Sequence, residues 1–258
     1  MINFDFKKSL GQNFLKDSNI IKKISDSIDV NKEDLIIEIG PGSGALTKEL
    51  IKKQSDVICF EIDKRLESIL NEIKSDNLKI IFEDFLKVDL NKYILPKYKR
   101  VFFVGNLPYY ITTAIVNKIT SESNPFEIII MIQKEVAQRF LATPNSKEYN
   151  SLSVFLQYNY EIKKICNVSK NSFIPSPKVD STVIKLIKNK KIIAKNEEKF
   201  YKLVNDSFKQ KRKNLKNNLK NYDLEKVEKI LKQFNKDLTY RAEEIEISEF
   251  IEISNQYD

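Results

Sequence analysis

The pentapeptide Gly40-Pro41-Gly42-Ser43-Gly44 follows a strand-like run over residues 35–39 and precedes a helix-like run that begins at Ala45. The chain has five glycines, and three of them lie in this pentapeptide. Glycine adopts positive φ without strain and lets a ligand approach the backbone closely. Because α/β proteins hold nucleotide-like cofactors at a glycine turn between a buried strand and a helix N-terminus, the pentapeptide predicts such a site.

Apolar runs alternate with helix-like stretches over the first two-thirds of the chain. These runs are nearly continuous, which indicates a doubly wound, mostly parallel sheet with helices on both faces. Two later strand-like runs, 151–166 and 179–187, have no obvious helix between them and indicate an antiparallel hairpin at one edge. The remaining strands are expected near 35–40, 56–61, 78–83, 100–105 and 126–132, and helices near 17–28, 44–53, 64–74, 111–120 and 134–141.

The last part of the chain has a different character. The charged stretch Lys188-Asn189-Lys190-Lys191 has the composition of a linker, and helical periodicity follows it to the end of the chain. Within that part, the spacing of Phe208, Leu215 and Leu219 predicts that they share one helical face. The pattern predicts an α/β domain over residues 1–190 and a small all-helical domain over residues 191–258.

Charge is unevenly distributed along the chain. The net charge is +8 and the pI is near 9.1, which favours a polyanionic partner. Residues 188–220 carry twelve Lys or Arg against three Asp or Glu, and residues 207–220 carry six against none. The basic surface is therefore expected to be local.

Several classes of protein are excluded or disfavoured by composition. The chain has no histidine, which excludes a histidine base, triad or metal ligand. Cys59 and Cys166 are too few for a disulfide framework or a zinc site, and their apolar surroundings indicate buried structural thiols. No apolar run approaches the ~20 residues of a membrane helix, and the N-terminus lacks a signal-peptide pattern. We expect a cytoplasmic monomer that holds no metal.

Polar residues end three successive strands of the predicted sheet. Glu61 ends the second strand, 21 residues after Gly40, where an acid accepts hydrogen bonds from ribose hydroxyls. Asp84 ends the third strand, placed to meet an adenine edge, and Asn106 ends the fourth, just after Gly105. A strand-end Asp or Asn is also a common helix cap or turn residue. Together with the glycine turn, the three residues nevertheless predict a cofactor crevice.

The glycine turn alone does not identify the ligand, because Gly40-x-Gly42-x-x-Ala45 followed by Glu61 also fits the dinucleotide pattern. The discriminating feature is Asn106-Leu107-Pro108-Tyr109, which suits methyl transfer to a planar exocyclic amine. Such an amine is a poor nucleophile, since its lone pair is delocalised into the ring. The Asn106 side-chain oxygen and the Leu107 carbonyl can accept hydrogen bonds from the two N–H groups of this amine. Pro108 fixes the turn, and Tyr109 offers a face for stacking.

These motifs resemble those of the KsgA family of ribosomal RNA adenine N6,N6-dimethyltransferases over almost the full chain. The resemblance implies a seven-stranded class I methyltransferase (Rossmann-like) sheet with a small C-terminal helical domain, and S-adenosylmethionine as cofactor. The segments that carry it are Ser9–Leu15, Glu38–Thr47, Asn106–Tyr109, Phe173–Ser181, Phe208–Leu215 and Arg241–Glu243.

The resemblance also implies a role for each matched residue. Glu61 would contact the cofactor's ribose and Asp84 its adenine, and Phe173 would stack on the target adenine opposite Tyr109. The expected cofactor-binding residues are Asn13, Leu15, Gly40, Gly42, Glu61, Asp84 and Asn106. The expected catalytic residues are Asn106, Leu107, Pro108, Tyr109 and Phe173.

The family methylates two adjacent adenosines in the hairpin loop near the 3′ end of 16S rRNA, on a late assembly intermediate of the small ribosomal subunit. The residues expected to contact RNA phosphates are Lys209, Lys211, Arg212, Lys213 and Lys216. The chain departs from the family pattern at Tyr110, where Asn is more frequent, and we expect a slightly altered base pocket there. Lys211 replaces an Arg, which keeps the charge but loses bidentate geometry.

Three alternatives remain open from the sequence. A related enzyme that dimethylates one adenine of large-subunit RNA, and confers macrolide resistance, shares the glycine turn and the amine pocket. Residues 44–47 and the Lys/Arg motif at 209–213 favour the small-subunit target. A non-catalytic RNA-binding assembly factor is disfavoured by the intact motif at residues 106–109, and a dinucleotide oxidoreductase is a more distant alternative.

Overall fold

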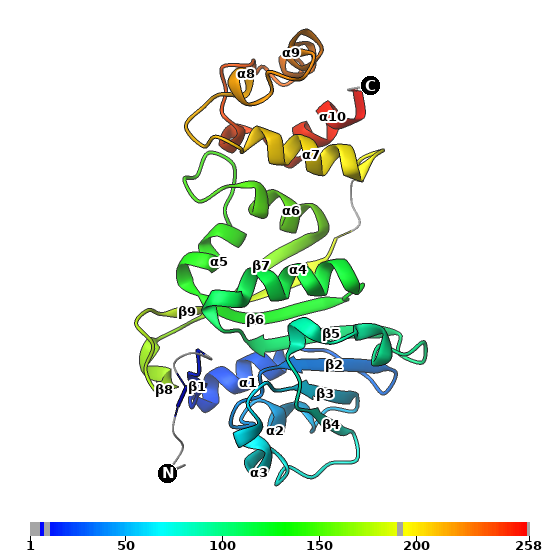
Figure 1. The fold of residues 1–258 in the computed structure, drawn as a ribbon, viewed down its shortest axis with the longest axis vertical. Coiled ribbons are helices and arrows are strands. Elements are labelled where there is room, and N and C mark those ends of the chain that lie inside the picture. Colours follow the sequence, from blue (N-terminus) through cyan, green and yellow to red (C-terminus); the bar gives the residue numbers. More distant parts are fainter. Residues whose placement is uncertain (1–5, 8–10, 190–192, 257–258) are drawn as a thin grey trace. The chain divides into compact units, whose positions relative to one another are not determined.

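A seven-stranded sheet organises the first part of the chain in the computed structural model (Figure 1). Its order is β4-β3-β2-β5-β6-β9-β7, with β2, β3, β4, β5 and β6 parallel and β9 antiparallel to β6. The winding direction changes between β2 and β5, which confirms the predicted doubly wound, mostly parallel sheet. The strands are β2 (Asp34–Ile39), β3 (Asp56–Phe60), β4 (Leu78–Ile81), β5 (Arg100–Asn106), β6 (Glu127–Gln133), β7 (Tyr160–Val168) and β9 (Ser181–Lys188).

The structure describes residues 6–7, 11–189 and 193–256, and these form two compact units. The first unit runs to residue 137 and resumes over 163–187; the second consists of residues 138–162 and the chain from 188 onward. Residues 138–162 fall within the 1–190 range expected for the α/β domain. The expected boundary at residues 190 and 191 lies outside the described residues.

Both faces of the first unit's sheet are covered. On one face, Ile24 of α1 (Ser18–Asp26) and Leu50 of α2 (Thr47–Leu50) share a buried cluster with Phe102 of β5. On the other face, Phe85 packs edge-on against Phe103 at a centroid distance of 6.4 Å. The alternation of Phe102 and Phe103 between the faces follows from the two-residue period of a strand. Further elements of this unit are η2 (Lys64–Leu66), α3 (Glu67–Leu70), η3 (Phe85–Lys87), η4 (Leu90–Lys92), η5 (Tyr109–Ile111), α4 (Thr112–Glu122) and η6 (Lys170–Ser172).

Two predictions about local structure were wrong. Residues 151–166 do not form one strand, because α6 (Ser151–Asn159) precedes β7. A reciprocal capping box starts this helix: the Asn150 side chain accepts from the Ser153 N–H, and the Ser153 hydroxyl accepts from the Asn150 N–H. The expected helix near 44–53 is helical only over Thr47–Leu50.

A second, two-stranded sheet was not predicted. It pairs β1 (Phe14–Leu15) antiparallel with β8 (Phe173–Ile174). Each strand has two residues, too short for an alternating apolar pattern to be recognised in the sequence. The pairing joins two motif segments that are far apart along the chain.

The second unit is helical around its own core. Tyr158 of α6 stacks on Phe200 of α7 at a centroid distance of 4.3 Å, and Phe208 contacts both Tyr149 and Phe250. These aromatic contacts explain why α6 belongs with the later helices. The elements of this unit are α6, α7 (Glu197–Ser207), α8 (Leu215–Asn218), α9 (Leu224–Lys232), η7 (Ala242–Glu244) and α10 (Ile247–Gln256), while α5 (Lys134–Phe140) bridges the two ranges.

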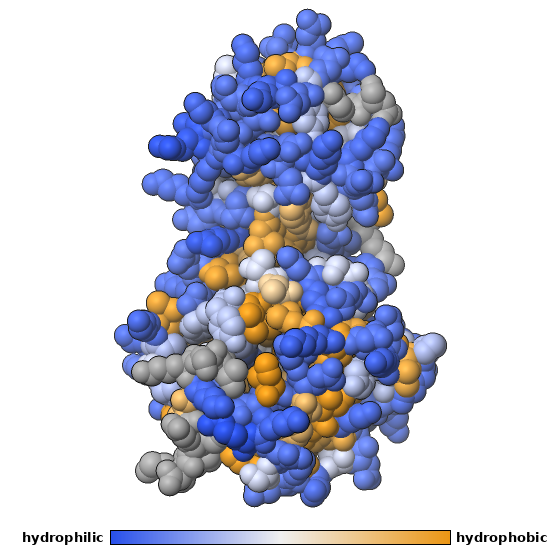
Figure 2. All heavy atoms as spheres, in the orientation of Figure 1, coloured by the Kyte–Doolittle hydropathy of each residue, from blue (hydrophilic) through white to orange (hydrophobic). Residues whose placement is uncertain are grey.

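Hydrophilic side chains cover most of the face shown in Figure 2, with hydrophobic patches among them. Within the described part of the chain, no helix is long and apolar enough to cross a membrane. Cys59 is buried, as predicted, whereas Cys166 is only partly buried, and both are free thiols.

Candidate active site

The glycine turn opens onto a pocket at the carboxyl ends of β2, β3 and β5. Gly40 and Gly42 have φ values of 69° and 58°, in the left-handed region that favours glycine. A Cβ placed on Gly40 would meet no atom within 4 Å, so its backbone faces open space. A Cβ on Gly42 would lie 3.0 Å from the Phe14 ring. The turn thus exposes backbone on one side and packs closely against the N-terminal segment on the other.

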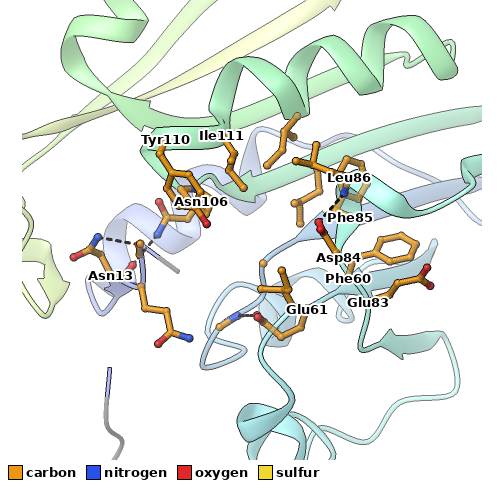
Figure 3. A pocket seen from close by; sticks show the side chains of 18 of the residues that line it. Asn13, Phe60, Glu61, Glu83, Asp84, Phe85, Leu86, Asn106, Tyr110 and Ile111 are labelled. Atoms are coloured by element: carbon orange, nitrogen blue, oxygen red, sulfur yellow. Dashed lines mark hydrogen bonds between the residues drawn. The ribbon is translucent and has the colours of Figure 1, made fainter. Parts of the chain in front are cut away.

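We call this cavity the strand-end pocket, and its empty volume is about 740 Å³ including its open mouth (Figure 3). Of the residues predicted from the sequence, seven line the pocket: Asn13, Gly40, Gly42, Glu61, Asp84, Asn106 and Pro108. The other lining residues are Gly11, Gln12, Phe14, Ile39, Phe60, Ile62, Glu83, Phe85, Leu86, Tyr110, Ile111 and Ile115.

Glu61 binds the glycine turn directly. One carboxylate oxygen accepts from the Gly42 N–H at 3.1 Å and the other from the Asp63 N–H at 2.9 Å. Burial raises the pKa of Glu61, while these two backbone hydrogen bonds lower it. The side chain therefore lies at the end of β3 in a defined orientation, next to the backbone that faces the pocket.

Asp84 lines the pocket and also caps a helix. Its Oδ1 accepts from the Leu86 N–H at 3.0 Å at the start of η3. The capping role expected of a strand-end Asp is therefore present, and it orients the carboxylate in the pocket wall.

Asn106 is oriented by the N-terminal segment. Its Nδ2 donates to the Asn13 carbonyl at 2.8 Å, and the Asn13 side chain donates to the Gly11 carbonyl at 3.1 Å (Figure 3). Because the amide nitrogen is held by this bond, the Asn106 Oδ1 is the atom placed to accept a hydrogen bond from a ligand. The sequence predicted both residues for the site but not their contact.

Gln12 is a site residue that the sequence analysis did not assign. Its Nε2 donates to Asp63 at 2.6 Å, and Asp63 also pairs with Arg65 at 2.6 Å. Hydrogen bonds from Arg65, followed by those from Gln12, lower the pKa of Asp63 to about 2. This contact fastens the N-terminal segment to the end of β3, only two residues beyond Glu61.

Four predicted residues do not line the strand-end pocket. Leu15 lines a smaller cavity beside it, together with Asn13 and Gly40. The Leu107 side chain is buried, and its N–H donates to the Met131 carbonyl. The other two are Tyr109 and Phe173.

Tyr109 and Phe173 are placed away from the cavity wall. The Tyr109 hydroxyl hydrogen-bonds to the Ser181 hydroxyl at 3.0 Å, and burial raises its pKa. Phe173 is 2% exposed and belongs to the core beneath α1. A stacking role for these two rings stays a prediction.

A buried carboxyl lies directly beneath the glycine turn. Glu38 accepts from the Thr47 hydroxyl at 2.6 Å and from the Cys59 thiol at 3.3 Å. Burial raises the pKa of Glu38 to about 7, against the lowering effect of these two hydrogen bonds. The network connects β2, α2 and β3 and thereby supports the turn from below.

The predicted RNA-binding cations all lie in the second unit and are all exposed. We call residues 209–213 the basic loop, and Lys216 follows in α8. The Asn218 side chain holds the ends of this loop: its Oδ1 accepts from the Gln210 N–H at 3.1 Å, and its Nδ2 donates to the carbonyls of Ser207 at 2.7 Å and Lys213 at 3.3 Å. The hydrogen bonds of Asn218 therefore fix the backbone of the loop that carries these cations.

Comparison with known proteins identifies relatives across the whole chain. The family described as "Ribosomal RNA adenine dimethylase" matches residues 3–258. The chain is 46% identical to "Ribosomal RNA small subunit methyltransferase A" of Bacillus pumilus (strain SAFR-032), over 98% of this chain and 91% of that protein. It is 43% identical to the protein of the same name from Geobacillus sp. (strain WCH70), with the same coverage.

Solved structures agree with this result. A dimethyladenosine transferase from Plasmodium falciparum superposes with a TM-score of 0.75 at 27% identity, covering 93% of this chain and 95% of that one. The 23S rRNA methyltransferase ErmE superposes with a TM-score of 0.79 at 24% identity, over 95% and 99% of the two chains, and supports the fold alone. Both the family match and the identity to curated relatives extend over nearly all residues, so the chain belongs to the ribosomal RNA adenine dimethylase family.

Proposed function

We propose that this protein dimethylates the N6 of two adjacent adenosines in the 3′-terminal hairpin loop of 16S rRNA, in the small ribosomal subunit during its late assembly. The observation that carries the proposal is the placement of Asn106 beside the glycine turn: its amide nitrogen is bonded to Asn13, and its oxygen has no hydrogen-bond partner among the described residues.

S-adenosylmethionine is the methyl donor of the family, and it supplies the transferable methyl group when bound. The residues of the strand-end pocket fit this molecule. The open space at Gly40 admits a ligand against the backbone, and the carboxylates of Glu61 and Asp84 can accept from hydroxyl and amine groups. Phe60, Ile62 and Phe85 add apolar walls of the kind that hold a planar base. Asn13, Leu15, Gly42 and Asn106 complete the proposed binding set.

The chain's own residues would act by positioning the target amine. The Asn106 Oδ1 and the Leu107 carbonyl would accept hydrogen bonds from the two N–H groups of the target amine. This arrangement favours the pyramidal, nucleophilic form of the nitrogen. Pro108 holds the intervening turn in the required conformation. Catalysis of this kind depends on orientation and on preorganised dipoles and needs no strong base, which agrees with a chain that lacks histidine.

RNA binding is assigned to the second unit in this proposal. The basic loop and Lys216 would neutralise phosphates of the small-subunit RNA, and the first unit would carry out the methyl transfer. We also propose that the protein acts as a monomer in the cytoplasm, where the small subunit is assembled.

The large-subunit target is the main alternative. The likeness to ErmE extends over the whole fold, so architecture alone does not separate the two targets. The 46% identity to a small-subunit enzyme favours the small-subunit assignment.

The experiment that tests the proposal is methyl transfer from labelled S-adenosylmethionine to unmethylated small subunits and to naked large-subunit RNA, with the modified bases mapped. Label on two adjacent adenosines near the 3′ end of 16S rRNA is the expected result. Label on large-subunit RNA alone would replace the target and retain the chemistry. If neither substrate is labelled, the protein is better described as a non-catalytic binding factor.

A further inference from the structure

Tyr110 lies at the mouth of the strand-end pocket with an exposed aromatic ring. Its side chain lines the pocket together with Asn106 and Ile111, and 64% of the residue is exposed to solvent (Figure 3). Covering an exposed aromatic ring removes apolar surface from water, so a ligand or partner that packs on the ring gains free energy. Its position beside the proposed amine-binding residue therefore calls for a functional explanation.

The preceding tyrosine provides an internal contrast. The Tyr109 hydroxyl is bonded to Ser181, and its ring is partly buried outside the pocket lining. Among the described residues, the Tyr110 hydroxyl has no hydrogen-bond partner. Of the two adjacent rings, Tyr110 is the one that is available to a molecule entering the pocket.

One edge of the Tyr110 ring is supported by the N-terminal segment. A Cβ on Gly11 would lie 3.4 Å from the Tyr110 Cε1 and 3.2 Å from the Pro108 Cβ, so both side chains pack against the bare Gly11 backbone. Gly11 has a φ of 62°. The ring is thus held at one edge while the rest of it remains open.

We propose that Tyr110 is an RNA-contacting residue that stacks on the nucleobase next to the target adenosine. The inference rests on the proposed function, because it requires an RNA substrate whose target base leaves its stack and enters the pocket. The neighbouring base then lies at the mouth and loses one stacking partner. An aromatic ring at that place restores a stacking surface of the kind that binds any base.

The proposed substrate makes this position more informative. When two adjacent adenosines are modified in turn, each serves once as the target and once as the neighbour. A stacking surface without base-specific groups suits this exchange, since adenine and N6-methylated adenine both present the same ring face. Tyr110 would then favour completion of both modifications on one small subunit.

The test compares Tyr110→Ala and Tyr110→Phe in single-turnover methyl transfer on unmethylated small subunits. Loss of the ring should raise the subunit concentration needed for half-maximal rate by about 5- to 100-fold, the range of one lost base-stacking contact. The maximal rate should change much less, and Tyr110→Phe should stay close to wild type. Leu95→Ala removes another exposed apolar side chain, 44% exposed, that is not in the pocket lining, and it should have no effect.

A double-mutant cycle identifies the contacted base. Small subunits reconstituted with an abasic nucleotide in place of one of the two adenosines should lose most of the difference between wild type and Tyr110→Ala.

Additive effects of the RNA and protein changes would overturn the proposal, as would a Tyr110→Ala variant that matches wild type on intact subunits. Weakened S-adenosylmethionine binding in Tyr110→Ala, measured by calorimetry without RNA, would instead assign the ring to the cofactor. If wild type transfers no methyl group, the proposed function itself fails, so the two failures are distinguishable.

Discussion

The strand-end pocket and the basic loop differ in the charge that they present to a ligand. The pocket is acidic, because Glu61, Glu83 and Asp84 all lie in its wall. The basic loop carries exposed cations, with no acidic residue between positions 207 and 220. A small cationic methyl donor suits the first environment and a polyanion the second. In the proposed function, the two regions would divide the binding of cofactor and RNA according to charge.

The two regions also differ in how their polar groups are held. In the pocket, Asn106, Glu61 and Asp84 each make a hydrogen bond of 2.8–3.1 Å to backbone atoms, so their side-chain orientations are fixed. In the basic loop, the backbone is held by Asn218 while the cationic ends extend into solvent. We therefore expect changes in the pocket to alter rate, and changes in the loop to alter affinity and its dependence on salt.

Asn106→Ala should give the largest effect. Removal of a preorganised hydrogen-bonding group from the transition state typically costs about 10²- to 10³-fold in rate, and we expect a loss of that size in methyl transfer. Binding to small subunits should persist, because the loop is unchanged. Rate and binding can be measured on the same preparation, by label incorporation and by cosedimentation.

The matched control for this variant is Asn117→Ala, at an exposed position of α4. It removes the same side chain from the same unit without touching the pocket. Unchanged methyl transfer in Asn106→Ala would show that the amine pocket is assigned to the wrong residues.

Replacement of the five cations Lys209, Lys211, Arg212, Lys213 and Lys216 by Glu should give the next largest effect. If the five neutralise about five phosphates, wild-type affinity for the RNA should fall by roughly two to three decades between 50 and 200 mM salt. The variant should lose most of that dependence, while its binding of S-adenosylmethionine stays unchanged. A salt slope equal to that of wild type would remove the RNA-binding assignment of these residues.

Lys211 is expected to contribute less to RNA binding than Lys213 does. Its Nζ donates to the Lys147 carbonyl at 2.7 Å, so part of its hydrogen-bonding capacity is used within the second unit. Lys211→Ala should therefore change the salt slope less than Lys213→Ala does. Equal changes in the two single variants would show that the contact with Lys147 is released when RNA binds.

The strand-end pocket could be predicted from the sequence because its elements have strong local signals. The glycine turn, the strand-end Glu61 and the tetrapeptide at 106–109 each follow a near-continuous apolar strand. The contacts that orient them were not predictable, since Asn13 and Asn106 are 93 positions apart and neither residue type implies the other. Such pairings depend on the tertiary fold, which periodicity does not encode.

The errors in the fold have a similar origin. The α6 segment is rich in apolar residues, so its helical period is hidden and it resembles a buried strand. The spacing of Asn150 and Ser153 was the available signal for a helix start there. In the second unit, the charges of the basic loop were evident, whereas the role of Asn218 depends on which carbonyls the folded loop presents to it.

Glu38→Gln should reveal the buried carboxyl beneath the glycine turn through the pH dependence of stability. The folded-state pKa of about 7 lies above the unfolded value of 4.5, so the folded state binds more protons between these pH values. Stability from this group is therefore present at low pH and is lost as pH rises towards 7, by about 3 kcal/mol in total. Chemical unfolding should show Glu38→Gln similar to wild type near pH 4.5 and more stable near pH 8. Glu61 remains in both proteins, so the difference in their free energies of unfolding isolates Glu38. A difference in free energy of unfolding that does not change with pH would contradict the prediction.

Asn218→Ala should give the smallest effect. It separates the contribution that the ordered loop backbone makes to RNA binding from the contribution of the loop's charges. The variant loses the hydrogen bonds to Gln210, Ser207 and Lys213 but no cation, so the salt slope of RNA binding should stay constant. Affinity at fixed salt should fall by about tenfold, because the loop must be ordered during binding instead of before it. Trypsin should also cleave the loop of the free variant faster than that of wild type. The control is Asn217→Ala, whose exposed side chain donates to Asn214 at 2.6 Å and makes no hydrogen bond to the backbone of residues 209–213 in the described part of the chain. Equal effects of the two variants would mean that α8, and not the Asn218 amide, determines the conformation of the basic loop.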